Sequence, residues 1–535
     1  MEIIDCFFIG YNNIEIAKQR QLLRLTYGGN SHHYRETNMS SKGYLKHNNH
    51  LFSASELFNE FNKDHEIVDN SFDALSIHET FNLAIAYLGT YLNKRGHTIG
   101  YINSFNSEKE VLAEMLKQSL IRVIAIPTTF YIMTYPIIEI ISFIRKYSQS
   151  VKIIMGGTYI ANQVRTLEEA ALKSFFTYLG ADIYVYSNEG EQALNGIIQA
   201  LKSGGSLEGI DNIYFKESNV YQFTRLSTEE NPIDEDPVNW NLFSDKIGRF
   251  VNIRTSVSCP YSCSFCNFPR YAGKYRLASL QIIENEIKAI NSIGKIEGMW
   301  IIDDTFNIPA ERVKEIMRIM IKNNNRVKWQ AHIRCQYVDR EMVELMKQSQ
   351  CRHCILGIES GSPEILKNMN KKAQIDKYRQ GIALLNEYGI TTTALFIIGF
   401  PGETRETFDE TYRFIEEVKP TYFQARLWWC DQDTPIYQEK DKYKLEGEGY
   451  DWYHATMNSD TASELINELF FNIKNSIFES DFPIPFHLSC RGISDEKIKT
   501  YLKTFNECIR IKLKSKNEEA TNPEMIQKMK EIFIM

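Results

Sequence analysis

Short apolar segments alternate with amphipathic segments in two long series, and this alternation limits the folds open to the chain more than any other feature. In the first series, strand candidates lie at residues 98–103, 121–128, 152–157 and 182–187. Helix candidates lie at 76–96, 108–119, 135–147 and 165–178, with another after 188. Continuous apolar strands separated by amphipathic helices indicate a parallel sheet covered on both faces. The sequence therefore predicts an α/β, doubly wound (Rossmann-like) domain over residues 71–215.

The second series contains six strand candidates, at 250–258, 298–306, 327–334, 354–360, 391–400 and 422–430. A helix pattern follows each of them except the last. This order predicts a partial (β/α)6 TIM-type barrel over residues 246–435. We expect no strand after residue 436, so residues 436–535 are predicted to form a helical C-terminal domain.

The remaining segments are assigned as connections. Residues 1–70 open with a strand-like piece and continue as a polar stretch, and they are predicted to form an N-terminal extension. His32 and His33 lie in that stretch and are better explained by an exposed loop than by a metal site. Residues 216–245, which combine part of a probable hairpin with an acidic, proline-containing segment, are predicted to be the linker between the two domains.

Composition excludes several classes of function. The 535 residues include 43% hydrophobic and 24% charged residues, which is typical of a soluble globular protein. The formal net charge of −7, without a basic stripe, argues against nucleic acid as a partner. No uninterrupted apolar run is long enough to suggest a membrane span. Ten cysteines, three of them clustered, do not suggest a disulfide framework, so we expect a cytoplasmic protein with reduced thiols.

The segment "SCPYSCSFCNFP" (258–269) places Cys259, Cys263 and Cys266 on the loop after the first barrel strand. A structural zinc site requires four ligands. Three thiolates can instead hold three irons of a cubane cluster and leave the fourth iron open to a substrate or cofactor. The alternatives are a zinc site completed by a distant Cys or His, such as Cys351 or Cys354, and a non-catalytic iron–sulfur or zinc-binding protein.

The cysteine spacing, with Phe265 beside the last cysteine, resembles the signature of the radical S-adenosylmethionine (SAM) superfamily. "IIDDTF" (301–306), "GIESGS" (357–362) and "IIGFPGET" (397–404) follow in the family's order. The resemblance implies a [4Fe–4S] cluster on Cys259, Cys263 and Cys266, whose open iron binds SAM before SAM is cleaved to a 5′-deoxyadenosyl radical. It also implies SAM contacts from Phe265, Arg334, Glu359, Ser360 and Gly399.

A doubly wound domain directly before such a barrel resembles the cobalamin-binding class of this superfamily. The motif Asp-x-His-x-x-Gly of many cobalamin domains is absent where "YINSFNSEKE" (101–110) stands. Either cobalamin binds without a histidine ligand or the domain no longer binds it. The resemblance implies that cobalamin contacts fall on Thr128, Thr129, Gly156, Gly157 and Glu189.

"IDCFFIGYN", "CSFCNFPRYAGKYR" and "LWWCDQDTPIY" resemble the phosphinothricin P-methyltransferase (PhpK-like) family. This implies a methyltransferase that acts on the phosphorus of a phosphinate, or on an unactivated carbon of a peptide or other natural-product intermediate, with an electron donor such as flavodoxin or ferredoxin. A cobalamin-binding radical SAM cyclase or rearrangement enzyme is the alternative. Cys430 is a candidate catalytic relay, although packing explains it better, and packing is also favoured for Cys351 and Cys354.

Overall fold

The computed structural model describes residues 3–12, 16–28, 43–63, 75, 79–218, 220–481, 483–515 and 522–534. His32 and His33 lie outside the described residues. The chain divides into two compact units. The first unit comprises Met1–Ile14 and Thr80–Val251, and the second comprises Glu15–Glu79 and Asn252–Met535. Within the described residues, no helix combines the length and apolarity needed to cross a bilayer.

The first unit is built on a seven-stranded sheet with the order β4-β1-β5-β6-β7-β8-β9. Its strands are β1 (Ile3–Tyr11), β4 (Ile99–Ser104), β5 (Leu120–Pro127), β6 (Lys152–Gly156), β7 (Ile183–Val185), β8 (Ile213–Glu217) and β9 (Val220–Phe223). The strands from β4 to β7 in this order run parallel, and β8 and β9 add an antiparallel hairpin at the edge. The doubly wound sheet and the hairpin agree with the expectation from the sequence.

Helices separate the parallel strands of the first unit. They are α4 (Leu83–Lys94), α5 (Lys109–Gln118), α6 (Tyr135–Tyr147), α7 (Thr158–Thr166), α8 (Glu169–Leu179) and α9 (Glu191–Ser203). The helix expected over 165–178 corresponds to α8, whereas α7 was not expected, and the chain is extended at Leu167 between the two. Apolar side chains such as Phe7, Ile124, Ile140 and Phe176 form one buried cluster between sheet and helices.

The expected boundaries of the N-terminal extension need correction. β1 is not peripheral, because it lies in the interior of the sheet and pairs with both β4 and β5. Its residues from Ile4 to Tyr11 are all buried, as expected for a parallel strand covered on both faces. Residues 16–63 belong to the second unit. An insertion therefore separates β1 from the rest of its own sheet, and this concealed its role in the sequence.

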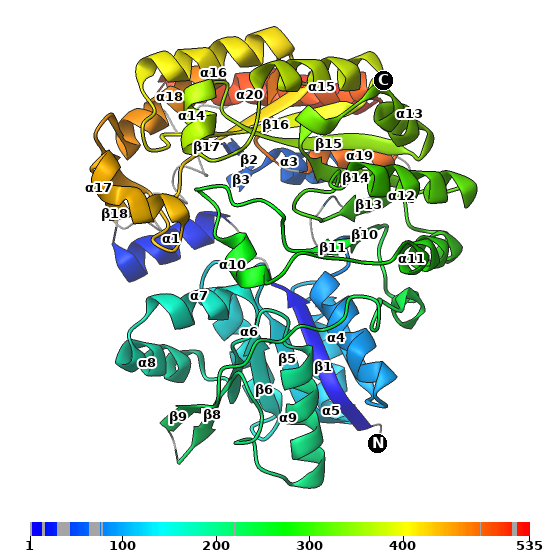
Figure 1. Cartoon of the computed structure of the whole chain (residues 1–535). Coiled ribbons are helices and arrows are strands. Elements are labelled where there is room, and N and C mark those ends of the chain that lie inside the picture. Colours follow the sequence, from blue (N-terminus) through cyan, green and yellow to red (C-terminus); the bar gives the residue numbers. More distant parts are fainter. Residues whose placement is uncertain are drawn as a thin grey trace. The chain divides into compact units, whose positions relative to one another are not determined.

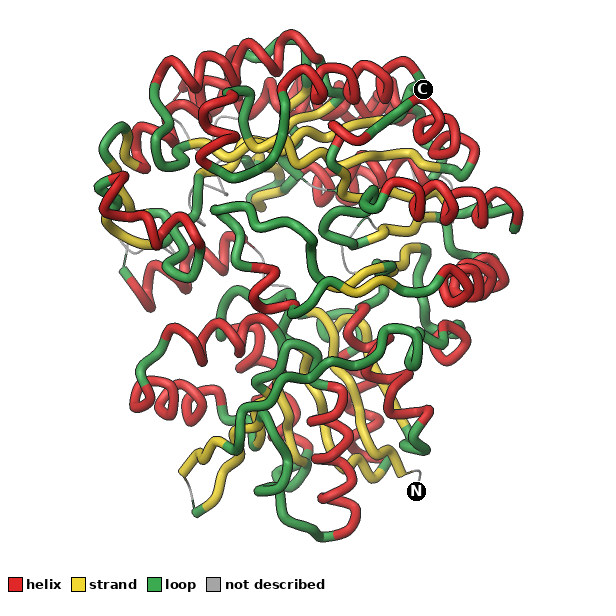
Figure 2. Tube along the Cα trace, viewed as in Figure 1, coloured by secondary structure: helices red, strands yellow, loops and turns green. Residues whose placement is uncertain are grey.

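The second unit contains a seven-stranded sheet with the order β10-β13-β14-β15-β16-β17-β21. The strands are β10 (Phe250–Ile253), β13 (Gly298–Ile301), β14 (Lys328–Ile333), β15 (Cys351–Glu359), β16 (Thr391–Ile398), β17 (Tyr422–Leu427) and β21 (Ile477–Phe478). All pairings described from β13 to β21 are parallel. The first six strands correspond to the six expected from the sequence, and Figure 2 shows the strands with helices around them.

Helices follow the strands as in a barrel of β/α repeats. They are α11 (Leu280–Ile293), α12 (Ala310–Lys322), α13 (Arg340–Gln348), α14 (Pro363–Asn368), α15 (Ile375–Glu387) and α16 (Arg405–Val418). Helices α12, α13, α15 and α16 lie on the outer side of the sheet (Figure 1). A representative contact joins Phe414 of α16 to Phe396 of β16. The opposite side, called the inner face below, carries Trp300, Gln330, His332, His353, Thr393, Leu395, Ile397, Gln424 and Arg426 by strand alternation and register.

The prediction that strands end before residue 436 is wrong. β21 extends the barrel sheet, and a separate antiparallel sheet contains β18 (Glu446–Glu448), β19 (Asp451–His454) and β20 (Met457–Asn458). These strands have two to four residues, too few to show a period in the sequence. The rest of this region is helical, with α17 (Lys440–Tyr443), α18 (Ser459–Asn472), α19 (Ile484–Cys490), α20 (Asp495–Ser515) and α21 (Pro523–Ile534).

The two ends of the second unit pack together. The early segment contributes α1 (Ile16–Tyr27), β2 (Leu45–His47), β3 (His50–Phe52) and α3 (Ala54–Asn62). Phe58 of α3 packs edge-on against Phe533 of α21, with 4.8 Å between ring centroids. The Tyr501 hydroxyl of α20 donates to the Ala54 carbonyl at 2.7 Å. This contact between chain ends is a long-range arrangement that no local pattern could predict.

Candidate active site

The three-cysteine segment lies between β11 (Ser256–Val257) and α10 (Phe268–Ala272), on the loop that follows β10. Asp303, at the end of β13, fixes the beginning of this loop. Its buried carboxylate accepts hydrogen bonds from the Thr255 amide at 2.6 Å, the Ser256 amide at 3.1 Å and the Thr255 hydroxyl at 2.6 Å. Farther along, the Ser264 amide donates to the Met369 carbonyl at 2.8 Å. The loop is therefore held at the carboxyl ends of two different strands.

Cys263 is the most enclosed of the three thiols. Arg334, at the end of β14, donates from its guanidinium to the Cys263 sulfur at 3.2 Å and to the Lys371 carbonyl at 2.6 Å. The same guanidinium lies 3.4 Å from the centre of the Tyr261 ring. Burial raises the pKa of Cys263, while the charges of Lys371 and Arg334 act in the opposite direction. Burial also raises the pKa of Cys266, to about 11.

The donor set fits an iron–sulfur cluster chemically, because three thiols share one short loop beside two cations. Cys263 and Cys266 belong to the same turn, in which the Cys266 amide donates to the Cys263 carbonyl at 3.1 Å. The Cys259 sulfur lies 3.7 Å from the Thr305 hydroxyl. Among the residues that the structure describes, no three His, Cys, Asp or Glu side chains are already gathered as a metal site. Cluster ligation by the three cysteines thus stays a prediction.

Cys351 and Cys354 are the cysteines named above as possible fourth ligands of a zinc site. Both are buried at the amino end of β15, with 3.7 Å between their sulfurs, whereas the cysteine loop contacts the chain beyond the carboxyl end of that strand. Cys354 precedes Glu359 by five residues, which corresponds to roughly 16 Å along an extended strand. This placement supports packing roles for Cys351 and Cys354 and argues against either of them as a fourth zinc ligand.

Glu359 forms a buried ion pair at the carboxyl end of β15. One of its carboxylate oxygens lies 2.7 Å from the Lys371 ammonium, which is itself buried. Glu359 has a φ of +67°, an uncommon conformation for a residue other than glycine and one found at functional sites. A Cβ on Gly357 would lie 2.9 Å from the Glu359 carboxylate, so a larger residue there would displace the pair. The site therefore presents one carboxylate in a defined position.

Phe265 and Gly399, both predicted SAM contacts, lie near this pair. The half-buried Phe265 ring is 5.6 Å from the Lys371 ammonium and 6.5 Å from the Phe400 ring. Gly399 has a φ of +86°, and a Cβ there would lie 2.4 Å from the Trp452 ring. Trp452 belongs to β19, so the strands missed in the sequence help to shape this corner of the site.

Glu403, in the segment "IIGFPGET", is fully buried and accepts a hydrogen bond from the Gly399 amide through one oxygen. Its other carboxylate oxygen has no hydrogen-bond partner among the described residues. Burial raises its pKa from an ordinary value of 4.5 to about 8. Glu403 is therefore mostly protonated in the folded protein at neutral pH.

This raised pKa predicts a pH-dependent stability. Below pH 4.5 the carboxyl is neutral in both the folded and the unfolded protein, and its stabilising contribution is fully present. As pH rises from 4.5 to about 8, ionisation of the unfolded state lowers the free energy of unfolding by about 1.4 kcal/mol per pH unit, and the contribution is lost above about pH 8. In Glu403→Gln, the side-chain oxygen can still accept the hydrogen bond from the Gly399 amide, but the side chain no longer titrates. We expect the unfolding temperature of the variant, relative to wild type, to be higher at pH 8 than at pH 5.5. A difference that is the same at both pH values would contradict the assignment.

Two predicted site residues already have partners within the protein. Ser360 is fully buried, and its hydroxyl lies 3.2 Å from the Thr411 hydroxyl and accepts from the Ser362 amide at 3.1 Å. Cys430 is buried, and its sulfur lies 3.5 Å from the Gly447 carbonyl. Burial raises the Cys430 pKa to about 12, which disfavours a thiolate at this position. These contacts support structural roles, and the proposed roles in SAM binding and hydrogen transfer stay predictions.

The inner face of the sheet changes character along the strands. Toward the amino ends it is buried and polar, and the His353 imidazole, the Thr393 hydroxyl and the Glu479 carboxyl form a hydrogen-bonded chain with distances of 2.8 and 2.6 Å. Toward the carboxyl ends the face is accessible, since Leu395 and Ile397 are half-exposed although their outer-face neighbours are buried. The inner face therefore has buried polar groups toward the amino ends of the strands and an accessible surface toward their carboxyl ends.

Arg426 is the charged group on that open surface. It is exposed, and within the described residues it makes no ion pair and donates only to the Gln424 side-chain oxygen, at 3.4 Å. The stacked Trp300 and His332 rings, with 5.7 Å between centroids, are on the same face. The arrangement offers a cation, a flat aromatic pair and aliphatic side chains to a bound molecule.

Analysis of the sequence missed Arg426 and Lys371 as candidate site residues. A charged residue inside the buried parallel strand "YFQARL" (422–427) was the available signal for Arg426. Lys371 carried no such signal, because "NKKAQ" (370–374) resembles a surface loop. Its burial against Glu359 depends on the tertiary fold.

In the first unit, the four Thr and Gly residues predicted to bind cobalamin meet at the carboxyl ends of β5 and β6. The Thr128 amide and hydroxyl both donate to the Gly156 carbonyl, at 2.7 and 2.8 Å. Gly157 has a φ of +107°, and a Cβ there would lie 3.0 Å from the Thr128 amide nitrogen. Phe130 and Ile132, on the loop after β5, are 54% and 70% exposed. This edge therefore offers an apolar surface where open α/β sheets bind ligands.

No described histidine lies at that edge. His97 is the one histidine between residues 80 and 251, and it precedes β4 at the amino edge of the sheet. Its ring contacts the Asn195 side-chain oxygen at 3.0 Å. The described residues of this unit therefore offer apolar contacts at the carboxyl edge of the sheet but no histidine there.

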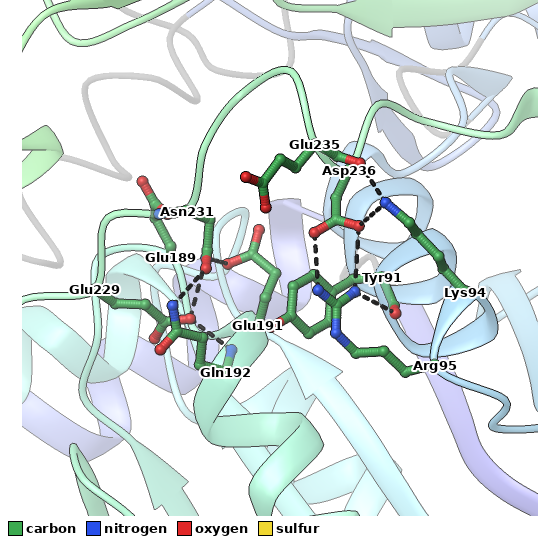
Figure 3. Close-up of polar contacts among 10 residues, drawn as sticks. All are labelled: Tyr91, Lys94, Arg95, Glu189, Glu191, Gln192, Glu229, Asn231, Glu235 and Asp236. Atoms are coloured by element: carbon green, nitrogen blue, oxygen red, sulfur yellow. Dashed lines mark hydrogen bonds and ion pairs between the residues drawn. The ribbon is translucent and has the colours of Figure 1, made fainter.

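Glu189, the fifth predicted cobalamin contact, binds the segment 216–245 that was predicted to be a linker. Its carboxylate accepts from the Asn231 amide at 2.7 Å (Figure 3). Glu229 lies in the same segment and accepts from the Gly190 and Gln192 amides. It thereby supplies hydrogen-bond acceptors to backbone amides at the beginning of α9. The predicted linker 216–245 is thus part of the first unit, in which Asp236 also pairs with Lys94, the last residue of α4, and with Arg95 directly after it. The contact with Asn231 supports a structural role for Glu189, and its contact with cobalamin stays a prediction.

Comparison with known proteins identifies the central part of the chain. Residues 253–415, from the end of β10 to within α16, match the model of the Radical SAM superfamily. This segment is therefore similar to a radical SAM domain. An uncharacterized methyltransferase of Pyrococcus horikoshii is 24% identical over 365 residues, which cover 65% of this chain and 77% of that protein. The anaerobic magnesium-protoporphyrin IX monomethyl ester cyclase of Cereibacter sphaeroides is 27% identical over 380 residues, which cover 66% of this chain and 59% of that protein.

Two solved structures share the fold around the radical SAM domain. The radical SAM methyltransferase TsrM from Kitasatospora setae, with cobalamin and a [4Fe–4S] cluster bound, has a TM-score of 0.55 at 18% identity, covering 68% of this chain and 72% of TsrM. The cobalamin-dependent radical SAM enzyme OxsB, with aqua-cobalamin bound, has a TM-score of 0.58 at 15% identity. The match covers 86% of this chain and 78% of OxsB. These matches confirm the α/β fold class expected from the sequence.

Proposed function

We propose that this protein is a cobalamin-dependent radical SAM methyltransferase that acts on an unactivated phosphorus (phosphinate) or carbon centre of a peptide or other natural-product intermediate. The observation that carries the proposal is the three-cysteine loop at the carboxyl ends of the strands of a radical SAM domain. The methyltransferase names of two matched proteins, TsrM among them, support the reaction type.

The cofactors assigned to this protein are a [4Fe–4S] cluster, SAM and cobalamin. Cys259, Cys263 and Cys266 would hold the cluster, and Arg334 keeps Cys263 in place through its hydrogen bond. Glu359, fixed by Lys371, would accept hydrogen bonds from the SAM ribose. Together the groups supply a radical that activates the substrate and a methyl group to transfer, while the protein orients them and excludes water.

Cobalamin would lie at the carboxyl edge of the first unit's sheet. Exposed Phe130 and Ile132 offer it apolar contacts, and Thr128, Thr129 and the Gly156–Gly157 turn form the adjoining edge. Its binding would not involve an axial histidine from the described part of this unit, since His97 is at the opposite edge.

The accessible inner face of the barrel suits an anionic substrate. Arg426 has no ion pair within the described residues and is exposed there, and a guanidinium binds the two oxygens of a phosphinate or carboxylate well. Leu395, Ile397 and the Trp300–His332 pair would contact the apolar part. We therefore favour a phosphinate-bearing or carboxylate-bearing acceptor.

The test is anaerobic reconstitution with iron, sulfide, cobalamin, SAM and a flavodoxin-based reductant. The acceptor probe is the H-phosphinate analogue of phosphinothricin, and phosphinothricin itself, already methylated at phosphorus, is the control. We expect a product heavier by one methyl group, with formation of S-adenosylhomocysteine and 5′-deoxyadenosine, from the probe alone. Methyl transfer only to a peptide acceptor would move the assignment from phosphorus to carbon.

A cyclase or rearrangement enzyme is the second candidate, because a protein named as a cyclase is 27% identical over 66% of this chain. That function predicts 5′-deoxyadenosine without S-adenosylhomocysteine and a product without an added methyl group. Formation of neither molecule would contradict both functions and favour a non-catalytic iron–sulfur protein.

A further inference from the structure

A cavity of about 370 Å³ opens at the amino ends of the last barrel strands, away from the cysteine loop. It lies where β16, β17 and β21 begin and where α20 passes them, and its lining includes Lys419, Lys474, Lys499 and Lys503. We call it the lysine cavity, defined by these four residues. β16 has eight residues, so roughly 26 Å of strand separates this edge from the carboxyl edge that bears the candidate active site.

No ion pair within the described residues offsets the charges of the lysine cavity, where Lys419, Lys474 and Lys503 are exposed and Lys499 is half-buried. Within the described residues, none of the four ammonium groups makes an ion pair or a hydrogen bond, and Asp495 is the single acidic residue of the lining. Lys314 illustrates the contrast, because its ammonium pairs with Glu311, Asp339 and Glu341. Lys499 and Lys503 are also four residues apart on α20, a spacing at which like charges destabilise a helix.

A buried polar group gives a second, independent indication of a ligand. Ser476 lines the cavity and is 8% exposed, yet its hydroxyl has no hydrogen-bond partner among the described residues. Buried hydroxyls in folded proteins almost always have a partner. The hydroxyl is shielded from solvent in the structure, so an anion oxygen in the cavity would supply a partner once the Ser476 side chain rotates toward it.

We propose that the lysine cavity binds a small molecule that carries a diphosphate or triphosphate group. Four lysines and one aspartate give a net charge of 4 − 1 = +3 from the lining residues, which matches a polyphosphate better than a single carboxylate. Lysine ammonium groups bind phosphate as point charges and adapt to several oxygens. The volume falls in the range of small-molecule sites, about 300–1,000 Å³, and exceeds the needs of one phosphate ion.

The distance from the cysteine loop separates this site from the proposed SAM and substrate sites. It also argues against the cavity as a docking point for an electron donor, which must approach the cluster. The proposal therefore does not depend on the proposed function, and catalysis need not be measured to test it.

The test measures binding of inorganic tripolyphosphate to the full-length protein by calorimetry at constant ionic strength, with sulfate as the comparison anion. We expect a saturable site that stabilises the protein thermally and prefers tripolyphosphate over sulfate. Lys499→Gln/Lys503→Gln should weaken binding at least tenfold. The matched control is Lys288→Gln/Lys322→Gln, which removes two positive charges that pair with Glu284 elsewhere and should leave the affinity unchanged.

Ser476→Ala supplies a variant without a change of charge, and it should weaken tripolyphosphate binding severalfold while the protein stays folded. Equal affinities of the two double variants would overturn the proposal. So would binding of sulfate and tripolyphosphate with the same affinity, since that result indicates only non-specific attraction. If the cavity binds an acidic protein but not tripolyphosphate, that result would also overturn the proposal.

Discussion

Cys263→Ser should abolish the iron–sulfur absorbance of the reconstituted protein and all cleavage of SAM. The substitution removes one of three thiolates, and it does so at the position where Arg334 donates to the sulfur at 3.2 Å. A serine hydroxyl is a poor ligand for cluster iron, so the remaining two cysteines cannot hold a cubane. Iron and sulfide content, visible absorbance and 5′-deoxyadenosine formation measure the loss.

Cys351→Ser is the matched control, because Cys351 is buried at the other end of β15, 3.7 Å from the Cys354 sulfur. We expect this variant to keep the cluster and SAM cleavage if it folds. Retained SAM cleavage in Cys263→Ser would refute the ligand assignment. Loss of bound metal in both variants, with an unchanged fold, would instead favour a zinc site that includes the β15 cysteines.

Arg426→Met should separate substrate methylation from SAM cleavage. The variant loses the exposed guanidinium of the inner face but leaves the cysteine loop and the Glu359–Lys371 pair unchanged. Losing a charge-assisted hydrogen bond of about 1.5–3 kcal/mol corresponds to about a 10- to 150-fold decrease in kcat/KM for the anionic acceptor. Formation of 5′-deoxyadenosine without acceptor should continue at the wild-type rate.

Arg426→Lys is the control, since it keeps the charge and should recover part of the lost kcat/KM. An equal loss of SAM cleavage with and without acceptor would show that Arg426 binds SAM instead of substrate. A neutral acceptor processed equally by wild type and Arg426→Met, together with no activity on any anionic acceptor, would refute the proposed substrate class.

The fold class could be predicted from the sequence because both sheets consist of local β/α repeats. Each repeat contains its own strand and helix, so the period of the apolar residues identified most elements within a few residues. The errors concern long-range pairing. β1 lies inside a sheet whose next strand in the chain begins at Ile99, and β21 joins the barrel after an intervening antiparallel sheet.

The candidate site was only partly predictable for the same reason. Cys259, Cys263 and Cys266 share one loop, so their spacing alone indicated the chemistry. Lys371 and Arg426 act from other elements, and their importance follows from burial against Glu359 and from exposure inside the barrel. The motif around Ser360 was recognised, but its hydroxyl turns toward Thr411 in the core.

The most direct test of the account is electron paramagnetic resonance of the reduced, anaerobically reconstituted protein before and after addition of SAM. An iron that lacks a protein ligand binds SAM directly, so the account predicts a reduced cubane signal that changes shape when SAM is added. A signal that SAM leaves unchanged, or a metal content of zinc without iron and sulfide, would contradict it.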